Sequence, residues 1–217
     1  MRKNAYINNQ DILHWYKTPE EMKFTEQGYP ILEPCSISIP RRGLNLIPFN
    51  YALNYKGDKS DVYIHFYIQD YLFNRIWNDP LRYIEVLKQY KGIVMPDFSL
   101  YYDMPLPLQQ FNHYRNLWFA RMCQINGIQV IPSVNWSDSC SYKFCFDGLP
   151  HNSIVMLSTI GSVRKNDTKD NFYAGVDKMI YRLNPEKILL RTTKNLYNKF
   201  KNEWSYKNLV FVDTNFN

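Results

Sequence analysis

Six short apolar segments recur along the chain from Asp61 onward, and longer amphipathic segments separate them. The apolar segments begin the stretches VYIHFYI (62–68), GIVMPDFS (92–99), IQVIPSVNWSD (128–138), SIVMLSTIG (153–161), KILLRT (187–192) and NLVFVDT (208–214). Apolar residues at consecutive positions are typical of strands that are buried on both faces of a parallel sheet. The pattern therefore predicts six strands, with connections long enough for crossovers between them.

The connecting segments carry apolar residues at the spacing of a helix. Helices are predicted at 80–91, 105–126, 170–183 and 196–204, where caps, prolines and glycines stand at the expected ends. In the longest of them, an apolar stripe is expected to face the core and His113 to lie on the surface. That stripe consists of Leu108, Phe111, Tyr114, Trp118, Met122 and Ile125.

The alternation of strands and helices indicates an α/β fold, a parallel sheet built from repeated βα units. Two architectures fit, a small or incomplete (β/α) barrel and a doubly wound sheet. Residues 1–50 differ, because five prolines interrupt them, and only short strands are predicted there, at SISIP (36–40) and LNLIPF (44–49). A short helix is predicted near 19–25. We expect residues 1–50 to form an irregular N-terminal arm or cover and residues 51–217 to form a single α/β domain.

The charge balance and the cysteines narrow the range of functions. Lys and Arg outnumber Asp and Glu by 26 to 20, which gives a net charge of +6 and an isoelectric point near 9.0. This modest excess permits a phosphate-bearing small molecule or a nucleic acid as partner. The four cysteines form no CxxC pair and the four histidines are scattered, so we expect no metal site. GxxxxGK[ST] and GxGxxG are absent, which leaves the cofactor open.

Membrane and export signals are missing from the sequence. No window approaches the roughly 18 apolar residues of a membrane span, and the first residues, MRKNAYINNQD, have no apolar signal core. We therefore expect an intracellular protein that does not contact a membrane and whose cysteines are free thiols.

Polar side chains follow the predicted strands at the points where the strands end. Because the carboxyl ends of parallel strands share one edge of the sheet, these side chains are expected to converge there. Trp136 offers a ring for stacking on a base or a sugar, and Arg191 suits bidentate contact with a phosphate. The predicted ligand-binding residues are Asp70, Asp97, Ser99, Asn135, Trp136, Asp138 and Arg191.

The same polar positions also have a simpler explanation. A strand that leaves the core usually becomes polar, and Asp, Ser and Asn cap the helix that follows. If the carboxylates of Asp70, Asp97 and Asp138 meet, they suit a divalent ion or acid–base chemistry. The sequence leaves the distances between them open.

The blocks IPFNYAL, VYIHFYIQD, YKGIVMPDFSLYYDMPLPLQ, NHYRN, QINGIQVIPSVNWSD, FCFDGLP and VMLSTIG lie between about residues 47 and 192. Together they resemble a domain-of-unknown-function family common in phages, prophages and plasmids and sometimes described as rolling-circle-replication-associated. PDFS and PSVNWSD are the most specific blocks. The resemblance implies a mobile-element origin and a cytoplasmic location in a bacterial host cell, without a settled activity. The recurring polar positions of the family fall here on Asp70, Asp97, Ser99, Asn116, Trp136 and Asp147.

Three functional hypotheses follow. The first is a phage or mobile-element protein that binds a nucleotide or another phosphate-bearing ligand at the carboxyl ends of its strands, in element maintenance, DNA replication or counter-defence. The second is a metal-assisted hydrolase or nuclease that uses Asp70, Asp97 and Asp138. The third is a non-enzymatic inhibitor that covers a host protein. Whether the protein is an enzyme, and its oligomeric state, are left open by the sequence.

Overall fold

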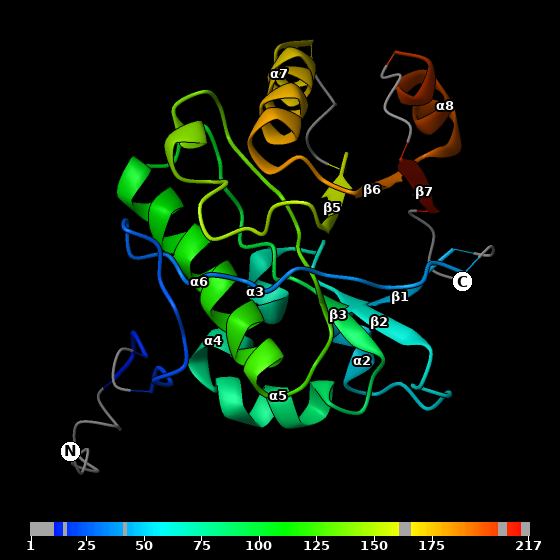
Figure 1. Ribbon diagram of the computed structural model, residues 1–217. Helices are drawn as coiled ribbons and strands as arrows, with labels where there is room; N and C mark the ends of the chain where they lie inside the picture. The colour runs from blue at the N-terminus through cyan, green and yellow to red at the C-terminus, as the bar shows by residue number, and fades with distance from the viewer. Residues whose placement is uncertain (1–10, 15–16, 41–42, 161–165, 204–207, 214–217) are drawn as a thin grey trace.

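The computed structural model describes residues 11–14, 17–40, 43–160, 166–203 and 208–213 (Figure 1). Its strands are β1 (Asn45–Pro48), β2 (Val62–His65), β3 (Gly92–Val94), β4 (Val130–Ile131), β5 (Ile154–Ser158), β6 (Lys187–Thr192) and β7 (Leu209–Asp213). Its helices are α2 (Phe49–Ala52), α3 (Asp70–Phe73), α4 (Arg75–Asn78), α5 (Pro80–Leu87), α6 (Leu106–Ile125), α7 (Asn166–Leu183) and α8 (Lys194–Glu203), with a short 3₁₀ helix, η1, at Ser141–Lys143.

All strands pair in parallel, as the sequence predicts, and they form two sheets. One sheet has the order β1-β2-β3-β4 and the other the order β5-β6-β7. A single parallel bridge between Ser133 and Met156 joins the two sheets. The strand order follows the chain order without the reversal that defines a doubly wound sheet. In the described part of the chain no ladder joins β7 to β1, so the α/β fold is an open arrangement and not a closed barrel.

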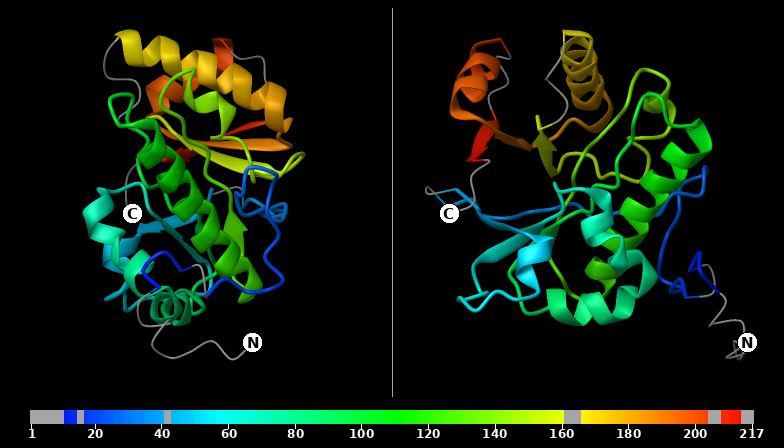
Figure 2. Two further views of the ribbon diagram at one scale, coloured as in Figure 1. Left: turned by 90° about the vertical axis from the view of Figure 1, so that its left-hand side faces the viewer. Right: turned by 180° about the vertical axis from the view of Figure 1, so that it is seen from behind.

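Each face of the strand layer carries its own apolar cluster. In β2, Val62 and Ile64 belong to the cluster that packs against the helices, whereas Tyr63 belongs to the other cluster. The second cluster, on what we call the inner face, consists of Tyr63, Val94, Ile131, Ile154, Met156, Leu189 and Val212, together with Cys35 and Ile37 of the arm. The expectation of strands buried on both faces is thus confirmed. Helices α7 and α8 cover one end of the molecule and α4 and α5 the other (Figures 1 and 2).

The N-terminal arm is irregular, as expected, and closes the inner face near the amino end of β5. The backbone nitrogen of Cys35 donates to Ser153 Oγ at 2.8 Å, just before that strand. The helix predicted near 19–25 is wrong. One hydrogen bond of 3.1 Å closes a single turn between Pro19 and Met22, and the chain then extends because Phe24 bridges to Pro30.

Strand β1 lies before residue 50 and pairs with β2, which confirms the strand predicted at LNLIPF. The strand predicted at SISIP (36–40) is wrong, because these residues pair with no strand and cover the inner face as an extended segment. The four-stranded sheet therefore draws on part of the segment that the sequence assigns to the arm. The division of the chain into an arm and one domain at residue 50 stays a prediction.

The long helix α6 is confirmed, and Trp118 and Met122 of its predicted stripe are buried, but the buried surface differs from the prediction in the first half of the helix. Leu108, expected inside, is 52% exposed, and His113, expected on the surface, is 1% exposed. The first half of α6 packs against loops with polar backbone groups and not against an apolar sheet. It therefore buries Gln109, Asn112 and Asn116, whose side chains bond those loops.

Candidate functional site

The inner face of the strand layer becomes polar toward the carboxyl ends of the strands. The alternation of side chains along β2, β4 and β6 places His65, Tyr67, Ser133 and Arg191 on this face. The hydroxyl groups of Tyr67 and Ser133 lie 2.8 Å apart and connect the ends of β2 and β4. The guanidinium carbon of Arg191 lies 5.5 Å from the centre of the Tyr67 ring. Three strands thus bring polar groups to one place.

Asp97 follows β3 and joins this group. Its residue is partly exposed, whereas its carboxyl group lies deep among protein atoms. Burial, with a smaller contribution from the negative charge of Asp70, raises the pKa of Asp97 to about 7. The Asn135 amide, which donates to Asp97 Oδ1 at 2.8 Å, and the charge of Arg191 act in the opposite direction. A carboxyl group that is near half-protonation at neutral pH suits proton transfer.

Asp70 and Ser99 form a second polar pair beside Asp97. Asp70 accepts hydrogen bonds from the Ser99 nitrogen at 3.1 Å and from the Ser99 hydroxyl at 2.9 Å. Because Asp70 stands in the first turn of α3, this pair ties the segment after β3 to the helix after β2. The guanidinium group of Arg115 adds a positive charge near this pair, and it lies 3.7 Å from the centre of the Phe98 ring. Burial lowers the pKa of Arg115, and the negative charge of Asp70 opposes this effect.

Asparagines of α6 hold the segment that carries Asp97 and Ser99. The fully buried Asn116 accepts from the Phe98 nitrogen at 2.8 Å and donates to the Phe98 carbonyl at 3.2 Å. The Asn112 amide donates to the Ser99 carbonyl at 2.7 Å. Neither asparagine touches the inner face, so both act by positioning the segment.

His65 is neutral at this site. Burial, and next the charge of Arg191, lower its pKa to about 3. Its Nδ1 accepts a hydrogen bond of 3.2 Å from the Tyr67 nitrogen. Burial also raises the pKa of Tyr67, which keeps the phenol protonated. The ionic groups are therefore Arg191 and the surrounding carboxylates.

We call Asp70, Asp97, Ser99, Asn135, Tyr67, Ser133, His65 and Arg191 the strand-end cluster.

Two of the predicted ligand-binding residues lie outside this cluster. The Trp136 indole donates to the Asn171 carbonyl at 3.2 Å and lies so close to α7 that a Cβ on Gly175 would be 2.0 Å from a ring atom. Asp138 accepts from the Cys140 nitrogen at 2.9 Å and so stabilises its own loop. No described contact joins Asp138 to Asp70 or Asp97.

Sequence reasoning missed His65, Tyr67 and Ser133. They precede the polar residues that mark the strand ends in the sequence. Each stands two positions along the chain from an apolar inner-face residue or from another of these three residues. Parity along the strand is the signal that finds them, because it separates side chains that face the helices from side chains that face inward.

The donor atoms of the strand-end cluster suit hydrogen bonding and charge pairing. Across the described residues, no group of three or more His, Cys, Asp or Glu side chains is placed to hold a metal ion. The four cysteines are free, and only Cys140 is exposed.

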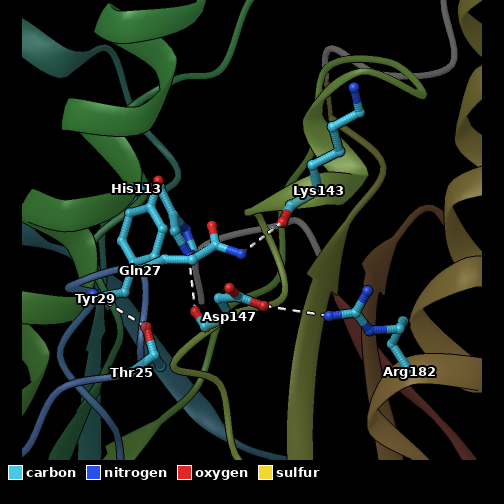
Figure 3. Close-up of polar contacts among 7 residues, drawn as sticks. All are labelled: Thr25, Gln27, Tyr29, His113, Lys143, Asp147 and Arg182. Atoms are coloured by element: carbon cyan, nitrogen blue, oxygen red, sulfur yellow. Dashed lines mark hydrogen bonds and ion pairs between the residues drawn. The ribbon is translucent and has the colours of Figure 1, made fainter.

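A second polar region lies at the amino ends of the strands. It is a cleft of about 390 Å³, lined by residues 25–27, 146–149 and 182–183 together with Ile31 and His151, which we call the arm cleft. Asp147 Oδ1 accepts from Arg182 at 3.2 Å, and its backbone carbonyl accepts from His113 Nε2 at 2.9 Å (Figure 3). Burial raises the pKa of Asp147, and Arg182 lowers it by a smaller amount.

Comparison with protein families gives a match over nearly the whole chain. Residues 8–209 match the family described as "Domain of unknown function (DUF4417)". The chain belongs to this family. Among curated proteins it is 36% identical over 131 residues to the Gene 1 protein of Mycobacterium phage L5, covering 60% of the chain and 57% of that protein. It is 32% identical over 126 residues to the Gene 1 protein of Mycobacterium phage D29, covering 58% of the chain and 47% of that protein.

The chain thus spans about half the length of these curated phage relatives. No solved structure is similar. The expected resemblance to a phage family of unknown function is confirmed. The strand-end cluster and the arm cleft both lie inside the part of the chain that matches the DUF4417 family. Within the described residues, no helix is long and apolar enough to cross a membrane.

Proposed function

We propose that this DUF4417 protein acts in a phage or mobile element and binds a small phosphate-bearing ligand, such as a nucleotide, at the strand-end cluster. One observation carries the proposal: the buried Arg191 faces inward beside Tyr67 and within electrostatic range of the carboxyl group of Asp97. A guanidinium group is the side chain best suited to a phosphate, because its donors match two phosphate oxygens at once.

Arg191 lies among acidic groups, one of which can lose its negative charge. Burial lowers the pKa of Arg191, and Tyr67, Asp213 and Asp97 act against that effect. Asp97 is the carboxyl group that can give way to a ligand, since its pKa of about 7 allows it to take up a proton. A protonated Asp97 no longer competes for Arg191 and offers an O–H donor to a phosphate oxygen.

The remaining members of the cluster suit the rest of such a ligand. The hydroxyls of Tyr67 and Ser133 and the amide of Asn135 donate and accept hydrogen bonds, as the hydroxyl and ring groups of a nucleoside require. Trp136 is not part of the proposed contact, because its ring packs against α7.

A nucleotide panel tests the proposal. The purified chain is titrated by calorimetry with AMP, ADP, ATP, cyclic AMP, cyclic GMP and pyrophosphate. At least one of them is expected to bind with a Kd below about 100 µM. Arg191→Met is expected to weaken that binding by about tenfold or more. Arg182→Met is the matched control, since Arg182 lies at the arm cleft, and it leaves the affinity unchanged. Absence of binding by every compound, or equal loss in both variants, contradicts the proposal.

A second candidate function is acid–base catalysis by Asp97, which its pKa of about 7 favours. The metal-assisted version with three carboxylates finds no support, because Asp138 stabilises its own loop and contacts neither of the other two acids among the described residues. If Asp97 transfers a proton, hydrolysis of a bound phosphate ester or N-glycosidic bond falls steeply in Asp97→Asn, while binding of the same compound persists. Equal turnover by wild type and Asp97→Asn contradicts this candidate.

The biological role stays a hypothesis. The candidate roles are element maintenance, replication, counter-defence and inhibition of a host protein. A phage that carries Arg191→Met in place of the wild-type gene separates ligand-dependent roles from occlusion of a host protein. A ligand-dependent role is lost in this variant, whereas occlusion by an intact surface persists.

A further inference from the structure

We infer that the arm cleft is a second binding site, which takes a small organic cation, an amine or a guanidine with an apolar body, on the carboxylate of Asp147. This site is independent of the ligand proposed for the strand-end cluster. It lies at the other end of the strands, because its residues come from the loop before β5, from the end of α7 and from the arm.

Only one of the two carboxylate oxygens of Asp147 has a hydrogen-bond donor among the described residues. Oδ1 accepts the Arg182 bond of 3.2 Å, and in the described part of the chain no donor reaches Oδ2. The Asp147 side chain is 16% exposed, so the carboxylate is shielded only in part. Lys143, the lysine drawn in Figure 3, points its ammonium group away from Asp147. A partly buried carboxylate oxygen without a donor favours a ligand that supplies one.

The position of Asp147 is fixed by the scaffold. Its backbone nitrogen donates to the Phe144 carbonyl at 2.9 Å, and its carbonyl accepts from His113 Nε2. His113 is 1% exposed, and its ring packs edge-on against Tyr29 at 4.9 Å. Burial lowers the pKa of His113 to about 4, so it stays neutral and places no cation beside Asp147. The acceptor is therefore preorganised.

The remaining walls define the rest of the ligand. Phe146, Leu149, Leu183 and Ile31 supply apolar surface, and Glu26 adds a second negative charge at the lining. The end of α7 lies at the cleft, and the C-terminus of a helix favours positive charge. A cleft of about 390 Å³ holds a compound of about the size of an arylalkylamine.

Phenethylamine and phenethyl alcohol form a matched pair of probes, since they share shape and differ in charge. Binding to the full chain is measured by ligand-detected NMR titration. We expect phenethylamine to bind with a Kd of about 1 mM or tighter, which is ordinary for a ligand of this size. Phenethyl alcohol is expected to bind at least about tenfold more weakly. Agmatine tests the guanidine head group, and 3-phenylpropionate tests an anion on Arg182.

Two variants are expected to change the amine affinity in opposite directions. Asp147→Asn keeps the shape and removes the charge, so amine affinity falls by about tenfold. Arg182→Met removes the competing cation, so amine affinity rises severalfold. Arg191→Met changes neither, which separates this site from the strand-end cluster. The inference is overturned if no amine binds, if Asp147→Asn binds amines as tightly as wild type, or if phenylpropionate binds through Arg182. Because the two variants act in opposite directions, a general loss of folding cannot imitate the expected result.

Discussion

The strand-end cluster and the arm cleft are both polar, but they are built in different ways. The strand-end cluster stands on strands of both sheets and on the loops after them, and asparagines of α6 bond its backbone. The arm cleft is closed by the arm, which contacts the loop before β5 through the Leu32–Gly148 hydrogen bond of 2.9 Å. The strand-end cluster therefore depends on the strands and on α6, whereas the arm cleft depends mainly on where one irregular segment lies.

Substitution of Asn116 by Ala should cause the largest loss of stability and should disturb the strand-end cluster. The change leaves the buried Phe98 nitrogen and carbonyl without their partner, which costs about 3 kcal/mol of unfolding free energy. Urea denaturation measures the loss. Asn202→Ala, at an exposed helical position, is the control and should change stability by less than about 0.5 kcal/mol. Equal stability of the two variants would contradict the role given to Asn116.

Substitution of Gly148 by Ala should lower the stability of the protein and disturb the arm cleft. A Cβ at this residue, whose φ is +79°, would lie 2.4 Å from the Pro30 carbonyl oxygen. We expect a loss of about 2–3 kcal/mol, from strain and from displacement of the arm. Gly28→Ala is a matched control, because Gly28 has φ +85° and nothing within 4 Å of the added atom. It isolates the backbone strain, about 1 kcal/mol. A loss no greater than that of Gly28→Ala would show that the arm does not press on this loop.

Substitution of Asp97 by Asn should stabilise the protein by an amount that grows between pH 3.8 and about 7 and is constant above. Folding raises the pKa of this carboxyl group from 3.8 to about 7, so between these values the folded state holds a proton that the unfolded state has released. Stability from this group is complete below pH 3.8 and is lost as the pH rises through about 7. We expect a gain on the order of 2 kcal/mol at pH 8 and little change at low pH. A gain that does not depend on pH would point to a cause other than ionisation.

Substitution of Trp136 by Phe should have the smallest effect on ligand binding. The lost bond to the Asn171 carbonyl costs about 1 kcal/mol of stability. Affinity for the strand-end ligand should stay within about twofold, because the ring faces α7. Calorimetry with the best ligand of the nucleotide panel measures this. A large loss of affinity would return Trp136 to the binding site.

The sequence predicts the strands and helices that follow from the spacing of apolar residues along the chain. Consecutive apolar residues in segments such as VYIHFYI identify the strands, and Asp79 with Pro80 marks the start of α5. The buried polar residues of α6 could not be predicted from its apolar stripe, since Asn116 and His113 are buried by bonds to backbone groups of distant loops. Such partners have no signature in the sequence near the residue itself.

The candidate site shows the same division. Asp70, Asp97, Ser99 and Asn135 were predicted from their places after strands, and the structure joins them by hydrogen bonds. Their role in binding a ligand stays a prediction. Trp136 and Asp138 have equally good places in the sequence, but the loop after β4 turns the first toward α7 and uses the second to stabilise itself. The direction of a loop is set by what it packs against, which the strand pattern does not contain.

The most direct test of the central claim is a carbon-detected NMR titration of the Asp97 carboxyl group in wild type and in Arg191→Met. If Asp97 and Arg191 share the inner face, the wild-type group titrates with a pKa of about 7. Removal of the Arg191 cation then raises the Asp97 pKa further, while Arg182→Met leaves it unchanged. An Asp97 that titrates near its ordinary value of 3.8, or that does not respond to Arg191→Met, would contradict the convergence of these two residues.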